Sequence, residues 1–234
     1  MNHEIQSVIR ERQSLRVPFD AGRPIDPEHL EQILEAARWA PTAHNMQNFS
    51  IVVIDDKASI DNLFSIPRPV SETFIRENAE QLSFSLEELT EKKTGLLGTM
   101  FPPSWRKPGF KLSDMSKEEQ ETMQRPLPPC PILLVVVFDP SRRAPASEGD
   151  FLGIVSLGCV MQNMWLTAHS LGIGFHILSS LGSGEAADAV KRILGIPSGL
   201  QIAFTCRLGY PMLEPPEYIR VRRITKDFVH MNRW

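Results

Sequence analysis

The stretch that decides the fold runs from residue 33 to residue 54 and reads ILEAARWAPTAHNMQNFSIVVI. Its first part belongs to a helix that begins at Pro27 with Asp26 as N-cap, because apolar side chains recur on one face. Those side chains are Leu30, Ile33, Leu34 and Ala37. Pro41 ends the helix, and Phe49–Ile54 is an apolar, β-branched run bounded by aspartates. The stretch therefore predicts a helix, a polar turn and a buried strand.

The same signals predict further strands and helices on both sides of this stretch. The strands are residues 131–138, 175–178 and 202–208, and the helices are residues 2–12, 151–171 and 183–194. Asp150 is the expected N-cap of the second of these helices, and Gly195 closes the third. No repeat or linker divides the chain, so we expect a single domain over residues 1–234.

Residues 65–128 differ in character from the rest, and we interpret them as an excursion from the core that forms a substrate-side cap. A charged amphipathic helix is expected from about Ser71 to Lys93, followed by an aromatic loop over residues 95–112. Ser116 and Glu119 make a capping box for a short helix. The loop aromatics either form an apolar lid over a substrate or pack among themselves. They are Phe101, Trp105 and Phe110.

Composition and charge favour a soluble, folded protein and disfavour nucleic-acid binding. The 234 residues are 42% hydrophobic and 23% charged, with a formal net charge of −3. The first residues lack a secretory signal, and the apolar run 151–173 contains Gln162, Asn163 and His169, which favours a buried helix over a membrane span. Cys130, Cys159 and Cys206 lie in apolar stretches, as reduced thiols do. We expect a cytoplasmic protein.

The helix over residues 151–171 is apolar nearly all round, so both of its sides must face protein. A single small domain rarely supplies two such walls. Gly153, Ser156, Gly158 and Cys159 would let another helix approach closely, which favours burial at the interface of a homodimer.

Three polar groups could carry chemistry. Arg12-Gln13-Ser14-Leu15-Arg16 suits an anionic ligand, unless it is only a solvated basic helix end. The turn over residues 40–48 can offer amide donors to a planar heterocycle, although as a bare loop it has low specificity. Arg220, Arg222 and Arg223 make either a phosphate clamp or a basic tail that serves solubility.

Several well-known signatures are absent from the sequence. It has no GxGxxG after a strand, no Walker loop, no HExxH and no GxSxG. The histidines and cysteines show no metal-ligand spacing, so no metal site is expected.

Taken together, these segments resemble the nitroreductase family. Its members start with a helix that leads to an Arg-Arg-Ser-x-Arg-like sequence, which corresponds to residues 12–16 here. The next family block, Ile-Leu-Glu-Ala-Ala-x-x-Ala-Pro-Ser-x-x-Asn-x-Gln-Pro, corresponds to residues 33–48. Blocks at residues 171–174, 194–197, 208–211 and 230–234 follow in the family's order. The resemblance covers residues 5–60 and 130–234.

The resemblance implies an α+β, nitroreductase-like fold with a mixed, mainly antiparallel sheet flanked by helices, in a domain-swapped homodimer. It also implies FMN as cofactor and NAD(P)H as reductant. The implied cofactor-binding residues are Arg12, Gln13, Ser14, Arg16, Pro41, Thr42, Ala43, Asn45, Gln47, Ser179, Ser180, Arg220 and Arg222. No residue is expected to act as a nucleophile, because the flavin carries the chemistry.

By the same resemblance, Arg12, Ser14 and Arg16 approach the FMN phosphate and the pyrimidine side of the ring, and Arg220 and Arg222 complete the phosphate site. Residues of the polar turn come from the other subunit to the far edge of the flavin, namely Pro41, Thr42, Ala43 and Asn45. Ser179 and Ser180 supply backbone amides near the reactive ring nitrogen. Gln13 and Asn48 depart from the family pattern, which usually has arginine or histidine at the first position and proline at the second.

The leading functional hypothesis is an NAD(P)H-dependent reductase of nitroaromatics, quinones or similar electron-poor acceptors. An alkene reductase or a dehalogenase working through the same flavin is an alternative. A protein that stores or delivers FMN without turnover is another. The sequence does not choose between NADH and NADPH.

Overall fold

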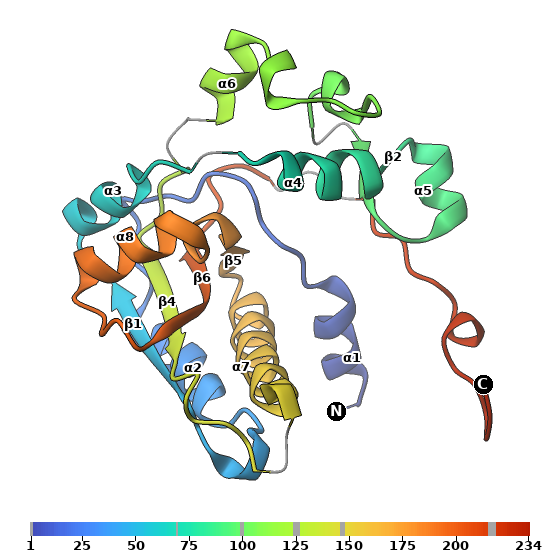
Figure 1. The fold of residues 1–234 in the computed structure, drawn as a ribbon. Helices are drawn as coiled ribbons and strands as arrows, with labels where there is room; N and C mark the ends of the chain where they lie inside the picture. Colours follow the sequence, from blue (N-terminus) through green and yellow to red (C-terminus); the bar gives the residue numbers. More distant parts are fainter. Residues whose placement is uncertain (1, 69, 99–100, 124–126, 146–147, 215–218) are drawn as a thin grey trace. The chain divides into compact units, whose positions relative to one another are not determined.

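The computed structural model describes residues 2–68, 70–98, 101–123, 127–145, 148–214 and 219–234. The chain divides into two compact units (Figure 1). The first contains Met1–Pro67 and Pro126–Pro215, and the second contains Arg68–Arg125 and Pro216–Trp234. Most of the second unit therefore falls within the predicted excursion of residues 65–128, and the C-terminal segment belongs to it as well.

A four-stranded antiparallel sheet forms the centre of the first unit. Its strand order is β1 (Phe49–Ile54), β4 (Ile132–Phe138), β6 (Gln201–Gly209) and β5 (Gly174–Ile177). The expected strands are confirmed to within two residues at each end. β1 was expected to be buried, but it is a sheet edge that pairs only with β4 among the described residues; Ser50 and Val53 are exposed, and only Ile54 is fully buried.

Helices cover both faces of this sheet (Figure 1). Alternate side chains of β4 point to opposite faces, as the pleat requires. Leu134 and Val136 pack with α2 (Pro27–Arg38) and α7 (Phe151–Ser170). Leu133 and Val135 pack with α3 (Lys57–Phe64) and α8 (Gly184–Leu194). The first unit is thus a helix, sheet and helix sandwich.

Local signals account for the ends of these helices. The Asp26 side chain accepts a hydrogen bond from the Glu28 N–H at 2.9 Å, which confirms the expected cap of α2. Asp56 caps α3 in the same way, accepting from the Ser59 N–H at 2.8 Å. α8 ends at Gly195, whose φ of 65° is the left-handed conformation that glycine adopts readily.

Helix α7 runs through the first unit and is longer than the others. Within the described residues it is the one helix long and apolar enough to cross a membrane, by length and composition alone. Its C-terminal part is packed, with Val160, Met164 and Ala168 fully buried. Asp150 does precede the helix, but its φ of 56° turns the backbone away and its side chain forms no capping hydrogen bond. That expected cap was wrong.

At its N-terminal end α7 exposes a run of apolar side chains. Phe151 is 68% exposed, and three more large apolar residues beside it are also open. They are Leu152, Ile154 and Val155. α1 (Asn2–Glu11) lies along the other end of α7, where Glu4, Ile5 and Val8 line a shallow groove with Leu166, Thr167 and Ser170.

The second unit is built from short elements around a small aromatic cluster. Its helices are α4 (Glu72–Ile75), α5 (Leu86–Lys92) and α6 (Lys117–Met123), and α4 continues into a π-helical stretch over Arg76–Gln81. Strands β2 (Ser83–Phe84) and β3 (Leu96–Leu97) pair in parallel. The single helix expected from Ser71 to Lys93 was wrong, because the pairing of β2 interrupts it and Ser85 starts a new helix.

Candidate functional site

The segment after α1 lies along β5, the edge strand opposite β1. The Leu15 N–H donates to the Phe175 carbonyl at 3.2 Å, and the Trp165 indole N–H donates to the Gln13 carbonyl at 3.2 Å. Because an edge strand has unpaired backbone groups, the segment can attach there without disturbing the sheet. Residues 12–16 are therefore held between α7 and β5.

The side chains of this segment offer positive charge and a hydroxyl group. The Arg12 guanidinium carbon lies 4.4 Å from the centre of the Trp165 ring, a cation–π distance that fixes the half-buried side chain. Arg16 is exposed, and Ser14 is half-buried. Within the described residues neither Arg16 nor the Ser14 hydroxyl makes a hydrogen bond or an ion pair. This set suits an anionic ligand.

Ser179 and Ser180 follow directly on β5, in a short 3-10 helix over Ser179–Leu181. Two hydrogen bonds with Thr205 hold the turn that leads into it: the Leu178 N–H donates to the Thr205 carbonyl at 2.8 Å, and the Thr205 hydroxyl donates to the Leu178 carbonyl at 2.6 Å. Both serines are exposed. The predicted arginine segment thus lies beside β5, and the predicted serine pair follows the end of the same strand.

The polar turn after α2 contains three non-glycine residues with positive φ. They are His44 at 51°, Asn45 at 53° and Gln47 at 46°. Such conformations are uncommon for residues with a side chain and are kept where the surroundings hold them. The Gln47 N–H donates to the Thr42 hydroxyl oxygen at 3.1 Å, and the Gln47 amide donates to Asn45 Oδ1 at 3.0 Å.

The turn is attached to the N-terminal half of α7, where the Ala43 N–H donates to the Ser156 hydroxyl oxygen at 2.9 Å. Arg12 contacts Trp165 in the same helix, and the two attachment points on α7 are separated by about 13 Å at the helical rise of 1.5 Å per residue. Within one chain the structure therefore does not bring the turn and the arginine segment together. At the end of the turn, Asn48 is 4% exposed, and its side-chain N–H group has no partner within the described residues.

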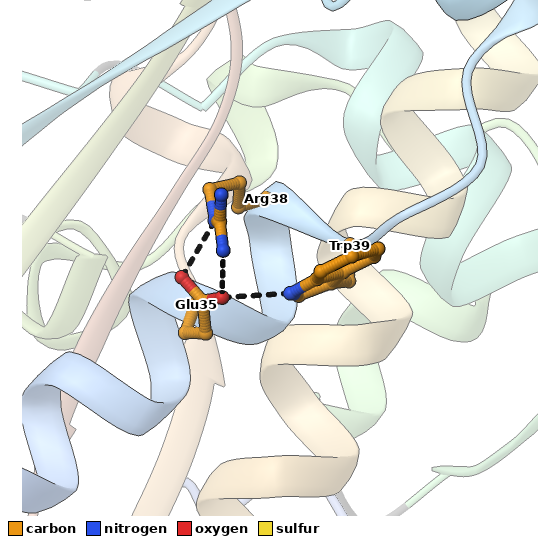
Figure 2. Close-up of polar contacts among 3 residues, drawn as sticks. All are labelled: Glu35, Arg38 and Trp39. Atoms are coloured by element: carbon orange, nitrogen blue, oxygen red, sulfur yellow. Dashed lines mark hydrogen bonds and ion pairs between the residues drawn. The ribbon is translucent and has the colours of Figure 1, made fainter.

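A polar triangle at the end of α2 fixes the point where this turn begins (Figure 2). The Glu35 carboxylate accepts from Arg38 Nε at 2.7 Å and from the Trp39 indole N–H at 2.7 Å, and it also accepts from the second Arg38 nitrogen. The Arg38 hydrogen bonds lower the pKa of Glu35, and the Trp39 hydrogen bond lowers it further. Trp39 is 72% exposed, so this contact orients a surface ring beside the turn.

A buried charged residue in the sheet was missed by the sequence reasoning. Arg207 lies in β6 with no exposed surface and donates through Nε to His176 Nδ1 of β5 at 2.9 Å. Burial lowers the pKa of His176 to about 3, and the positive charges of Arg207 and Arg16 contribute to this shift. The signal was present, because Arg207 is the charged residue inside an otherwise apolar and uncharged predicted strand.

The remaining predicted residues belong to the second unit. Trp105 is fully buried in the core of this unit, and the partly buried Phe101 and Phe110 pack against it at ring-centre distances of 6.1 and 6.4 Å. The aromatic residues were expected either to form an apolar lid or to pack among themselves. The fully buried position of Trp105 fits internal packing. Arg220 and Arg222 are exposed, and their meeting with the arginines of the first unit stays a prediction.

Two open grooves of the first unit lie outside this region. One has a volume of about 530 Å³ and lies along α2 and α7, lined by Glu28, Glu31, Glu35, Trp39 and neighbouring residues. The other, of about 250 Å³, lies between α1 and α7. None of the predicted cofactor-binding residues lines either groove.

Comparison with known proteins gives concordant matches over nearly the whole chain. The model of the nitroreductase family matches residues 9–210. A protein of Archaeoglobus fulgidus with the provisional name NADH dehydrogenase/NAD(P)H nitroreductase is 24% identical over 231 residues, which cover 99% of each chain.

Solved structures share the fold. A nitroreductase with bound FMN from Desulfitobacterium hafniense has a TM-score of 0.55 at 22% identity, covering 98% of each chain. A nitroreductase family protein from Clostridium difficile has a TM-score of 0.60 at 18% identity, covering 97% of this chain and 98% of that one.

Proposed function

The chain belongs to the nitroreductase family, and from this premise we propose that it is an FMN-dependent oxidoreductase. Its reaction would transfer hydride from NAD(P)H, through the flavin, to a nitroaromatic, a quinone or a similar electron-poor acceptor. The observation that carries the proposal is the position of Arg12–Arg16 along β5, the same strand that leads into Ser179 and Ser180.

The residues on this strand edge fit the groups of FMN. Arg16 and the Ser14 hydroxyl are uncommitted donors within the described residues, and Arg12 is held beside them by Trp165. When bound, FMN would supply the hydride acceptor and donor that no protein side chain provides. Arg12 and Ser14 would bind the phosphate, with Arg220 and Arg222 as further partners.

Arg16 would place a positive charge beside the pyrimidine side of the ring, where negative charge develops on reduction. The first N–H groups of a helix have no partner within that helix, so those of Ser179 and Ser180 are available to the ring. Gln13 fixes the segment through its backbone carbonyl, which accepts from Trp165, and this role does not depend on the side-chain type at position 13.

We propose further that the active form is a homodimer. The exposed apolar end of α7 supports this, because Phe151, Ile154 and Val155 would leave a large apolar patch in water. The turn containing Pro41, Thr42, Ala43, Asn45 and Gln47 is bonded to this same end of α7. Pairing of two α7 helices would carry the turn toward the flavin of the partner subunit, which explains its separation from Arg12 within one chain.

The binding part of the proposal is tested by titrating the purified protein with FMN and following the quenching of flavin fluorescence. We expect Arg16→Met to weaken binding about tenfold or more, since a charge-assisted contact to the ligand is lost. Arg192→Met is the matched control, because Arg192 is exposed on α8 and outside the candidate site. Equal affinities for the wild type and Arg16→Met would refute the assigned role of Arg16.

A further inference from the structure

The Arg207 guanidinium connects three separate segments of the first unit. Besides His176, it donates to the Val17 carbonyl at 2.7 Å, and to the Pro128 and Pro129 carbonyls at 3.4 and 3.3 Å. A buried charge is tolerated only when hydrogen bonds replace its hydration. These hydrogen bonds replace the hydration of the Arg207 guanidinium. They also fix the backbone at Val17, next to Arg16, and the side chain of His176.

The hydrogen bond between Arg207 and His176 determines where the imidazole carries its proton. Arginine Nε is always protonated and can only donate, so His176 Nδ1 must accept and carries no proton. A neutral ring then carries its proton on Nε2. His176 Nε2 makes no hydrogen bond within the described residues and is not among their buried polar atoms without a partner, so it remains open to solvent.

The open Nε2–H group lies in the candidate site. His176 follows Phe175, whose carbonyl accepts from Leu15, and it precedes the short 3-10 helix that begins at Ser179 after β5. Arg16 lies between Leu15, which donates to the Phe175 carbonyl, and Val17, whose carbonyl accepts from the same Arg207 that donates to His176. A neutral donor on β5 and a cationic donor on the segment attached to β5 therefore belong to the same strand edge.

We propose that His176 is a further ligand-binding residue of this site and that Arg207 is its positioning residue. Arg207 keeps the proton of His176 on Nε2, so that a neutral N–H donor accompanies Arg16 at the anionic ligand. The identification of that ligand as FMN rests on the function proposed above. The position of the proton does not, and it can be measured in the protein without ligand.

The first test is nitrogen-15 NMR of histidine-labelled protein without added FMN. In the wild type, His176 should show a protonated Nε2 and an unprotonated Nδ1, with no titration between about pH 5 and pH 8. In Arg207→Met the neutral ring should populate both tautomers, because Nδ1 no longer faces a permanent donor, while its pKa should rise only part of the way toward the ordinary value, because burial is the largest cause of the shift. A wild-type His176 with its proton on Nδ1, or with an ordinary pKa, would overturn the proposal.

The second test is FMN binding by variants of His176, which is half-buried and can be changed even if Arg207→Met does not fold. His176→Leu removes the donor and should weaken binding about tenfold, whereas His176→Gln supplies an amide donor and should recover most of the loss. Arg192→Met should bind as the wild type does. Wild-type affinity in His176→Leu would overturn the ligand role.

The two tests separate this proposal from the proposed function. Failure of the wild type to bind FMN would overturn the flavin function and the ligand role of His176 together. The NMR result would still decide whether Arg207 sets the position of the proton.

Discussion

Lowering the pH from about 8 to about 5 should destabilise the folded protein by about 2 kcal/mol through His176 alone. The folded-state pKa of His176 is about 3, and the ordinary value is 6.5. Below the ordinary value the unfolded chain takes up a proton that the folded chain does not. The stabilisation is therefore fully present above pH 6.5 and is lost as the pH falls from 6.5 toward 3.

The magnitude follows from the protonation of the unfolded ring. A pH of about 5 is about 1.5 units below the pKa of that ring, so its protonated form outnumbers its neutral form about thirtyfold. This ratio corresponds to a free energy of about 2 kcal/mol. The folded ring stays neutral at this pH because burial disfavours its charged form and because the positive charges of Arg207 and Arg16 oppose a further proton. This loss of about 2 kcal/mol is the same for any folded-state pKa well below 5.

The assay is urea unfolding at the two pH values, for the wild type and for His176→Gln. Glutamine keeps an oxygen that can accept from Arg207 and does not titrate, so its loss of stability between the two pH values should be about 2 kcal/mol smaller. Carboxylates with lowered pKa values, such as Glu35 and Asp56, titrate in both proteins and cancel in the comparison. An equal loss of stability in the two proteins would refute the reasoning.

Three further predictions concern other parts of the chain. Trp105→Ala should destabilise the second unit by about 3–5 kcal/mol, because a fully buried indole is lost, and Trp105→Phe should be milder; thermal unfolding that left the alanine variant unchanged would contradict this. Ser156→Ala leaves the Ala43 N–H without its acceptor and should raise proteolysis of the turn at residues 41–48, at a cost of about 1 kcal/mol; unchanged cleavage would argue against the attachment. Burial raises the pKa of Cys130 to about 12, so a thiol reagent at neutral pH should label Cys130 only after the protein is unfolded, and mass spectrometry that found Cys130 labelled in the folded protein would contradict the described burial.

The parts of the fold set by local signals were predictable from the sequence. Asp26 and Pro27 mark the start of α2, and Gly195 marks the end of α8, because caps and left-handed glycines act within a few residues. The continuous apolar run of β4 shows its central place in the sheet. The run at β1 did not reveal that it is an edge strand, because pairing depends on segments far away in the chain.

The helix expected over residues 71–93 failed for a similar reason. Its charged, amphipathic pattern continues through Phe84, but β2 pairs with Leu96 and Leu97, and that pairing interrupts the helix. A local signal was available: the Ser85 hydroxyl and the Glu88 carboxylate form a reciprocal capping box that starts a new helix.

For the site, the residue types could be predicted but their arrangement could not. Arg12 and Arg16 stand out as a basic group in an overall acidic chain. Two hydrogen bonds fix this group: Leu15 donates to the Phe175 carbonyl, and Arg207 donates to the Val17 carbonyl. Each bond joins residues 160 or more positions apart in the chain. Spacing along a single sequence carries no information on such contacts.

The central claim is that this strand edge holds a flavin that turns over. The most direct measurement is anaerobic mixing of the FMN-loaded protein with NADH or NADPH, followed by a quinone, while the visible absorbance of the flavin is recorded. We expect the absorbance to be lost with one of the two nucleotides and to return on addition of the quinone. A flavin that stays oxidised with both nucleotides, or a protein that retains no FMN, would contradict it.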